Sequence, residues 1–193
     1  MSVLGESFFE RSVQEVAPAL IGCELRFRGA GGIIVETESY ERDDPACHAY
    51  VGLTPRTSTL FGPPGRAYVY LSYGIHSLLN FVCEPAGSAA AVLIRALEPT
   101  RGIEAMARRR GRADRCELCS GPGKLTEALG IGLGHNGASI TAPPFELRPP
   151  AGSWRSVEVS RGPRIGISRA RELPWRFCAA GSAYLSRPEA LAA

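Results

Sequence analysis

The chain has 193 residues, of which 45% are hydrophobic and 21% charged, and its formal net charge at pH 7 is +3. This composition is typical of one folded domain of ordinary size, here residues 1–193, and excludes a disordered chain. Because no apolar run approaches the roughly 20 residues that span a bilayer, and no basic start leads into an apolar stretch as in a signal peptide, we expect a cytoplasmic protein without a membrane partner.

Arginine and cysteine usage adds little to this. Lys124 is the only lysine among 22 basic residues, and arginine suits phosphate contacts and stacking, but codon bias in a GC-rich genome produces the same skew. Of the six cysteines, Cys116 and Cys119 have zinc-like spacing, yet no second pair or nearby histidine pair completes four ligands. We therefore expect reduced thiols and no metal.

The first predicted elements are a helix and a β-hairpin. Ser12 and Glu15 have the spacing of a capping box, which predicts a short helix over residues 13–20. Residues 23–27 are then expected to form a strand. The glycine-rich residues 28–32 predict a turn that returns the chain into a second strand.

The second strand, residues 33–40, is the feature around which the chain is organised. Three apolar β-branched residues precede alternating acidic and small polar residues. A period of two places Glu36, Glu38 and Tyr40 on one face of this strand. Two carboxylates and a tyrosine that share a face near the end of a strand are costly to bury without a function.

A loop and a tyrosine-rich strand follow. Residues 41–64 are polar and rich in turn formers, which predicts a long ordered loop of the kind that is usually functional, and this loop carries His48 and Arg56. Residues 65–74 follow as a strand with three tyrosines: Tyr68, Tyr70 and Tyr73. An acid beside flat, hydrogen-bonding rings indicates a pocket that stacks a planar ring and performs acid/base chemistry on it.

Residues 78–83 and 90–97 predict two further strands, and residues 103–110 predict a helix. That helix ends in a basic cluster, residues 108–112. Such a cluster is either a solvated helix end that suits the helix dipole or a phosphate contact, and we weigh the two interpretations equally.

Another helix is expected to begin with Ser120 as its cap and to end at Gly130. Free backbone N–H groups at its start, beside Lys124, form a candidate phosphate site. Between residues 139 and 183, where proline and glycine mark turns, we expect three short strands, around Val157, Ile165 and Phe177. Residues 187–193 are expected to form a frayed tail.

Several stretches, in this order along the chain, resemble the alkyladenine (3-methyladenine) DNA glycosylase family. They are residues 35–40 (VETESY), His48, residues 68–74 (YVYLSYG), Asn80, residues 93–99 (LIRALEP), residues 119–125 (CSGPGKL) and residues 164–167 (RIGI). The resemblance runs from about Phe8 to Ser186. Each motif alone would be weak, but several independent motifs in the family order make the resemblance specific. The chain departs from better-known members at Ile75 and His76, where bulkier apolar or aromatic residues are common.

The resemblance implies an α+β fold: a single compact domain with a curved, mostly antiparallel β-sheet core, flanking helices and a protruding β-hairpin that enters the DNA minor groove. It implies a monofunctional DNA glycosylase of base excision repair, which flips a damaged purine out of the duplex and leaves an abasic site. The implied substrates are 3-methyladenine, 7-methylguanine, hypoxanthine and etheno-adenine. No cofactor is implied, and the partner is double-stranded DNA with a damaged purine, bound by a monomer.

The resemblance also assigns roles to residues. Glu38 matches the general base that positions the attacking water, and Arg95 matches the residue that holds water and phosphate near it. The residues expected to bind the base are Tyr40 and Tyr70 as stacking walls, His48 opposite them, and Asn80, which excludes purines carrying the exocyclic amino group of guanine. The residues expected to bind DNA are Tyr73, which wedges into the minor groove, Ile75, His76, Arg56 and Lys124.

Other functions stay open on the sequence alone. A module that binds distorted or alkylated bases without cutting would share Tyr73 and the tyrosine walls but would need no acid at Glu38. A hydrolase of a small planar substrate, such as a free nucleoside, would use His48 and Glu38 but would leave Lys124 without a purpose. A helix-hairpin-helix glycosylase fits poorly, because residues 121–124 lack the apolar flanks and the trailing catalytic aspartate of that motif.

Overall fold

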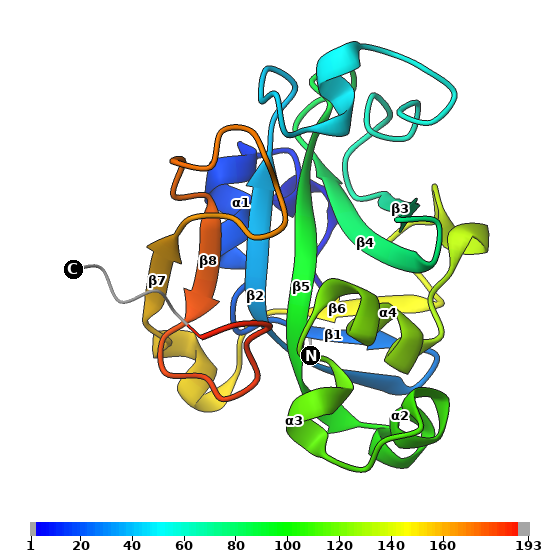
Figure 1. Cartoon of the computed structure of the whole chain (residues 1–193), viewed down its shortest axis with the longest axis vertical. Helices are drawn as coiled ribbons and strands as arrows, with labels where there is room; N and C mark the ends of the chain where they lie inside the picture. The colour runs from blue at the N-terminus through cyan, green and yellow to red at the C-terminus, as the bar shows by residue number, and fades with distance from the viewer. Residues whose placement is uncertain (1–2, 189–193) are drawn as a thin grey trace.

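A curved antiparallel sheet forms the centre of the computed structural model, which describes residues 3–188 (Figure 1). Over those residues the strands are β1 (Glu24–Phe27), β2 (Ala30–Tyr40), β3 (Ala67–Ser72), β4 (His76–Cys83), β5 (Ala90–Arg101), β6 (Phe145–Arg148), β7 (Val159–Gly162) and β8 (Arg176–Ala179). The sheet follows the order β3-β4-β5-β2-β1-β6, and β8 pairs with both β2 and β7.

Helices cover this sheet from both sides. Between residues 3 and 188 they are α1 (Val13–Ala19), α2 (Ile103–Arg110), α3 (Arg115–Leu118) and α4 (Pro122–Leu129), with the 3-10 turns η1 (Glu6–Phe8), η2 (His48–Val51), η3 (Leu133–His135) and η4 (Gly152–Ser156). In Figure 1, α1 lies behind β2, whereas α4 lies in front of the sheet and contacts β4 and β5. No helix in this described part of the chain is long and apolar enough to cross a membrane.

Strand β2 organises the sheet because it has three partners. Along one edge it pairs with β5 over most of its length. Along the other edge its first half pairs with β1 and its second half with β8, where Glu38 lies opposite Arg176. Shifts in the β2–β5 register fall between Ile34 and Thr37, and such bulges bend and twist a strand. Because β2 pairs with β5 on one edge and with β8 on the other, Glu36 and Glu38 lie between these two strands.

Two apolar clusters support this arrangement. In the main core, α1 presents Val13, Val16 and Ala17 to the sheet, all fully buried and at helical spacing. A second cluster lies under the loop of residues 41–64 and contains Cys47, Ala49, Leu60 and Tyr68. The second cluster explains why so long a loop is ordered, and it fixes the position of His48 within that loop.

The predicted fold is confirmed: the chain is an α+β domain with a curved, mostly antiparallel sheet and flanking helices. The helices expected at residues 13–20 and 103–110 are α1 and α2. The strands expected before residue 98 are β1 to β5, although β2 begins three residues earlier than predicted, at Ala30. That a β-hairpin of this fold enters a DNA groove stays a prediction.

The two predicted helix starts have different outcomes. Ser12 is the N-cap residue of α1, as predicted, but the capping box does not form, because the Ser12 side chain makes no capping hydrogen bond and the Glu15 N–H donates to the Ser12 carbonyl at 3.0 Å. The cap of α4 is Gly121, not Ser120. Gly121 has a φ of 151°, a conformation that favours glycine, and the Ser120 hydroxyl accepts a hydrogen bond from Lys124 at 3.3 Å. Packing on the sheet, not a side-chain cap, fixes where these helices begin.

The region after residue 139 differs most from the prediction. No strand forms around Ile165 in the described structure, because this residue lies in the loop between β7 and β8 and its N–H donates to Glu38. The strands expected near Val157 and Phe177 are β7 and β8, whereas β6 and α3, each of four residues, were not predicted. Of the expected tail, residues 189–193 lie outside the described residues, and the Arg187 carbonyl accepts a hydrogen bond from Arg176.

Candidate active site

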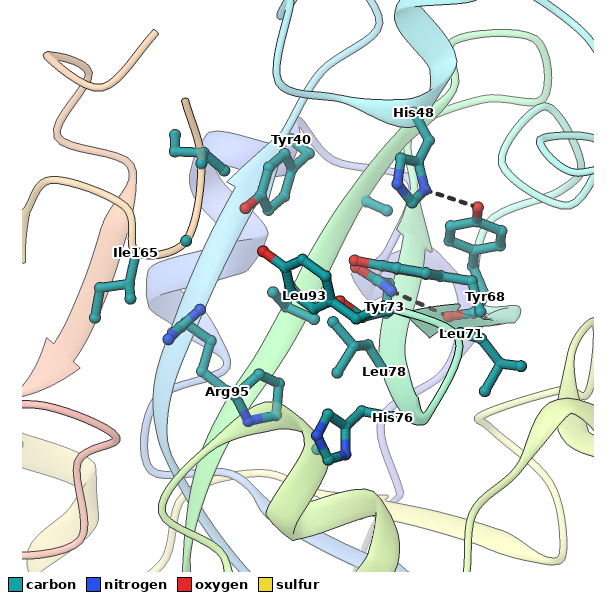
Figure 2. Close-up of a pocket in the computed structure, with 18 of the residues that line it drawn as sticks. Tyr40, His48, Tyr68, Leu71, Tyr73, His76, Leu78, Leu93, Arg95 and Ile165 are labelled. Atoms are coloured by element: carbon teal, nitrogen blue, oxygen red, sulfur yellow. Dashed lines mark hydrogen bonds between the residues drawn. The ribbon is translucent and has the colours of Figure 1, made fainter. Parts of the chain in front are cut away.

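A cavity of about 760 Å³ opens where β2, β3, β4 and β5 meet the loop of residues 41–64. In Figure 2, Tyr40 and Arg95 lie on one side of this cavity, and His48 and Tyr68 lie on the other. The predicted site residues that line it are Tyr40, His48, Arg56, Tyr70, Tyr73, His76, Asn80, Arg95 and Lys124. The sheet therefore brings together side chains that are up to 84 positions apart in the sequence.

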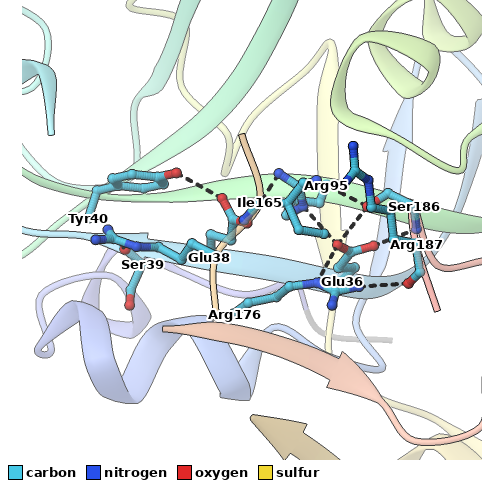
Figure 3. A network of polar contacts seen from close by, with 10 residues as sticks. Glu36, Glu38, Ser39, Tyr40, Arg95, Ile165, Arg176, Ser186 and Arg187 are labelled. Carbon is cyan, nitrogen blue, oxygen red and sulfur yellow. Dashed lines mark hydrogen bonds and ion pairs between the residues drawn. The ribbon is translucent and has the colours of Figure 1, made fainter. Parts of the chain in front are cut away.

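The carboxylate of Glu38 lies behind the cavity wall and is fully buried. Tyr40 donates its hydroxyl hydrogen to Oε2 at 2.8 Å, and the Ile165 N–H donates to Oε1 at 2.7 Å. The Arg95 Nη1 lies 3.2 Å from Oε1 (Figure 3). Burial raises the pKa of Glu38 above its ordinary value, and the charge of Arg95 opposes this effect without cancelling it.

Glu36, two residues earlier on the same strand, lies in a denser network. Its Oε1 accepts hydrogen bonds from the Nε atoms of Arg95 and Arg176 at 2.7 and 2.8 Å. Its Oε2 accepts one from the Ser186 N–H at 2.6 Å. Burial alone would raise the pKa of Glu36, but the charges of Arg95 and Arg176 hold it below the ordinary value. The predicted shared face of Glu36 and Glu38 is thus confirmed by their common partner, Arg95.

Arg164 fixes the orientation of Tyr40. Its guanidinium carbon lies 4.6 Å from the centre of the Tyr40 ring and 5.0 Å from that of the Trp175 ring. The same guanidinium binds the carboxylate of Asp44 through two nitrogens and donates to the Ser39 carbonyl at 3.0 Å. Burial and the charge of Glu38 raise the pKa of Tyr40 well above its ordinary value, so its hydroxyl remains a donor.

The opposite wall is formed by aromatic rings with Arg56 at their edge. The ring centres of His48 and Tyr70 are 4.4 Å apart in a T-shaped contact, and Tyr68 and Tyr70 are stacked at 5.4 Å. His48 Nδ1 lies 3.0 Å from the Tyr68 hydroxyl, and its Nε2 lies 3.4 Å from a nitrogen of Arg56. Burial, with a smaller effect of the Arg56 charge, lowers the pKa of His48 below its ordinary value. Since Arg56 can only donate, Nε2 is an acceptor and Nδ1 carries the proton.

Asn80 lies between these walls, on β4. It is 5% exposed, and its Nδ2 donates to the Tyr68 carbonyl at 3.1 Å. This hydrogen bond crosses the β3–β4 pair, in which the two residues lie opposite each other. The orientation of the Asn80 amide is therefore fixed by the sheet itself.

The turn between β3 and β4 lies at the mouth of the cavity. Tyr73 occupies this turn with a φ of 51° and a side chain that is 89% exposed. Gly74 follows with a φ of 74°, and the next residue, Ile75, is 73% exposed. A positive φ is uncommon for a bulky residue and often marks a functional site. The strand predicted over residues 65–74 therefore ends at Ser72, and Tyr73 lies in the turn that follows.

A buried carboxylate beside a cavity with aromatic walls suits acid/base chemistry on a planar ring. Comparison with known proteins identifies the family. The sequence model of a family described as methylpurine-DNA glycosylase (MPG) matches residues 7–183. The chain belongs to the methylpurine-DNA glycosylase family. It is therefore an enzyme of DNA repair, a glycosylase, and this predicted class is confirmed.

Three bacterial relatives support this placement, each with the provisional name 3-methyladenine DNA glycosylase. The relative from Rhodopseudomonas palustris strain BisB18 is 58% identical over 185 residues, which cover 96% of this chain and 91% of the relative. That from Bradyrhizobium diazoefficiens is 57% identical over 185 residues, with the same coverage. That from Nitrosospira multiformis is 56% identical over 180 residues, covering 93% and 92%.

The start of α4 borders the cavity of this glycosylase, but its charge is partly compensated. Lys124 Nζ lies 2.7 Å from the carboxylate of Glu117. A side-chain carbon of His76 lies 3.2 Å from the position that a Cβ on Gly123 would occupy, so a larger residue at 123 would require the exposed His76 ring to shift. The sequence placed Lys124 at a candidate phosphate site but did not indicate that Glu117 pairs with it and offsets part of its charge.

The basic cluster of residues 108–112 serves the fold in at least two of its members. Arg109 donates to the Ala128 carbonyl at 2.7 Å, near the C-terminal end of α4. Arg110 forms an ion pair with Glu127 of the same helix. Cations at such a helix end also interact favourably with its dipole. Arg109 and Arg110 thus attach α2 to α4, which favours the structural interpretation for these two residues.

Between positions 3 and 188, no group of three or more His, Cys, Asp or Glu side chains has a metal-binding arrangement. Cys119 is buried and contacts the Met106 sulfur at 3.8 Å.

Sequence reasoning missed several residues that support the site from distant parts of the chain. Arg176, Ser186 and Asp44 belong to none of the recognised motifs. Arg164 belongs to the motif of residues 164–167, but the motif did not indicate its contact with Tyr40.

Proposed function

We propose that this glycosylase flips alkylated or deaminated purines out of duplex DNA and hydrolyses their N-glycosidic bonds with water activated by Glu38. The observation that carries the proposal is the placement of this carboxylate at the back of a cavity with aromatic walls. The bond between sugar and base is buried in a duplex, so an enzyme must extrude the nucleotide to reach it.

The two walls suit a flipped purine. Tyr40 on one side and His48 with Tyr70 on the other present neutral rings for stacking. Neutral aromatic faces attract cations, so 3-methyladenine and 7-methylguanine, which are positively charged, should be preferred. Hypoxanthine and etheno-adenine are neutral, so they can stack on the same rings but lack this attraction. The amide of Asn80, held by the Tyr68 carbonyl, would oppose the exocyclic amino group of guanine, so 7-methylguanine, which carries that group, should be released more slowly than 3-methyladenine.

The contacts of Glu38 leave one acceptor position of its carboxylate for a water molecule. A carboxylate accepts about four hydrogen bonds, and Tyr40, Ile165 and Arg95 are the partners within the described residues. The remaining lone pair can accept a proton from water. In this step the water oxygen bonds to the anomeric carbon, the bond from that carbon to the purine nitrogen breaks, and the proton passes to Glu38. The products are the free base and an abasic site.

DNA binding is assigned to the turn at the cavity mouth. Tyr73, with Ile75 beside it, would enter the minor groove and fill the gap left by the flipped base. Both side chains are exposed and apolar, as a wedge between base steps requires. His76 and Arg56 flank the cavity and would contact the backbone of the same duplex. The protein is proposed to act as a monomer.

The mechanism is proposed to be monofunctional. A glycosylase that also cleaves the backbone forms a Schiff base through an amine. Lys124 is the only lysine, and its Nζ is paired with Glu117. Borohydride added during turnover should therefore trap no protein–DNA adduct, and an adduct that disappears in Lys124→Ala would contradict this assignment.

The test of the proposed function is incubation with labelled duplexes that contain one hypoxanthine or one alkylated purine, followed by alkali. We expect strand breaks at the lesion only after the alkali treatment, and none in the undamaged duplex. If no lesion duplex yields alkali-labile sites, while the protein is folded, the proposal is wrong.

A further inference from the structure

Arg95 is shared by two buried carboxylates. Its Nε donates to Glu36 at 2.7 Å, and its Nη1 lies 3.2 Å from Glu38. Its side chain is 6% exposed and both carboxylates are fully buried. In a buried site the direction of a charged group strongly affects its neighbours, because the local dielectric is low. The position of Arg95 therefore determines how strongly its positive charge interacts with the carboxylate of Glu38.

A segment far along the chain completes the network around Arg95. The Ser186 hydroxyl donates to Glu36 Oε1 at 2.8 Å and accepts a hydrogen bond from Arg95 Nη2 at 3.1 Å. The Ser186 N–H and Arg176 provide two further donors to Glu36. Figure 3 shows Glu36 at the centre of these contacts, with Arg95 on one side and Arg176 on the other. Two of the three guanidinium nitrogens of Arg95 are thus held by Glu36 and Ser186, and the third faces Glu38.

We propose that Glu36 and Ser186 are positioning residues, which hold Arg95 so that it contacts one oxygen of Glu38 and leaves the carboxylate able to take a proton from water. The inference rests on the proposed role of Glu38. Without Glu36, the fork of Arg95 is free to bind Glu38 with two nitrogens, the geometry that carboxylates and guanidinium groups prefer. A carboxylate engaged in this way is a poorer acceptor for the proton of water.

The mildest test removes only the bridging hydroxyl. Ser186→Ala keeps the backbone N–H that binds Glu36, so the fold should persist. We expect single-turnover base release to fall about tenfold, as for one hydrogen bond to a charged group, with lesion-duplex binding unchanged. Ser186→Thr restores a hydroxyl and should restore the rate. The control is Ser182→Ala in the same segment, where the hydroxyl serves only the Tyr184 N–H in the described contacts, and its rate should equal that of wild type.

A double-mutant cycle separates positioning from general support. In an Arg95→Lys background the fork is absent, so Ser186→Ala should cost less than about twofold there. A loss of equal size in both backgrounds would show that Ser186 does not act through Arg95 and would overturn the inference.

Glu36→Gln gives the stronger version of the test. Release should fall more than in Ser186→Ala while lesion binding persists, and the melting temperature reports whether the variant is folded. If Glu36→Gln unfolds, the Ser186 variants alone test the positioning role. A wild-type protein that releases no base overturns the proposed function. An active wild type, with Ser186→Ala as fast as Ser182→Ala, overturns only the positioning role.

Discussion

The two ends of the cavity are built on opposite principles. At the back, Glu36, Glu38 and Arg95 are at most 6% exposed and hold one another through ion pairs and hydrogen bonds. At the mouth, Tyr73 and Ile75 are 89% and 73% exposed and occupy a turn. The buried network has its geometry before any substrate arrives, whereas the exposed turn is proposed to make its contacts only when DNA binds.

This difference in exposure fits the proposed division of labour, with base release at the back of the cavity and DNA recognition at its mouth. Groups that act on developing charge are most effective when they are fixed in advance in a dry site, because they need no reorganisation during the reaction. Groups that fill a gap in DNA must be free to enter it, so exposure is a requirement for them. We therefore expect substitutions at the back to lower the rate of base release, and substitutions at the mouth to weaken the binding of lesion duplex.

The largest effect is expected at the back. Glu38→Gln keeps the shape of the side chain but cannot accept a proton from water, so base release should fall about a hundred- to ten-thousand-fold. Lesion-duplex binding, measured by titration, should be nearly unchanged. The control is Glu172→Gln, which alters an exposed carboxylate. Release by Glu38→Gln within a few-fold of wild type would remove Glu38 from its role and with it the contrast between the two ends.

At the mouth of the cavity, a substitution should weaken the binding of lesion duplex and leave the chemical step nearly unchanged. Tyr73→Ala leaves the vacated stack unfilled, and stacking of a base on an aromatic ring contributes about 1–3 kcal/mol. Binding of lesion duplex should weaken accordingly, while excision from single-stranded substrate, which needs no gap filling, should change little. Val51→Ala removes another exposed apolar side chain, 76% exposed and on η2, and serves as the control. Equal losses on single and double strands would refute the wedge.

The pH dependence of release tests the back without a mutation. Burial raises the pKa of Glu38, and only the ionised form can act as a base. Release should therefore fall about tenfold for each pH unit below that pKa, and the decline should begin above the ordinary glutamate range. The small residual rate of Glu38→Gln should lack this acidic limb. If the limb persists in that variant, the titrating group is another residue.

The sequence predicts the strands, and the residues at the back and the mouth of the cavity, better than it predicts the distant residues that hold the back in place. Alternation in residues 33–40 correctly placed Glu36, Glu38 and Tyr40 on one face, because period two is a local property of a strand. The wrong strand at Ile165 has a physical reason: its N–H is used by Glu38 and not by a neighbouring strand. A sequence pattern reports apolar periodicity, but it does not report which distant acceptor a backbone group finds.

The same limit applies to the site. Tyr70, Tyr73 and Arg95 belong to motifs with several recognisable neighbours, and all three line the cavity. Ser186 and Arg176 have no such motif, and they meet Glu36 across 150 and 140 positions of the chain. Their roles follow from β8 pairing beside β2, which no local property of residues 176 or 186 indicates.

The smallest effect is expected beside the mouth, at Lys124. This lysine is 37% exposed and paired with Glu117, which is 43% exposed, and such surface pairs contribute only about 0–1 kcal/mol. Since Glu117 already compensates part of its charge, Lys124→Ala should weaken binding of damaged and undamaged duplex equally, by less than about threefold. Glu117→Gln should have the opposite effect and strengthen both, because it frees the lysine for phosphate. Titrations at several salt concentrations should show the salt dependence rising in Glu117→Gln and falling slightly in Lys124→Ala. A loss confined to damaged duplex would instead place Lys124 with the groups that recognise the lesion, and the division between back and mouth would have to be redrawn around α4.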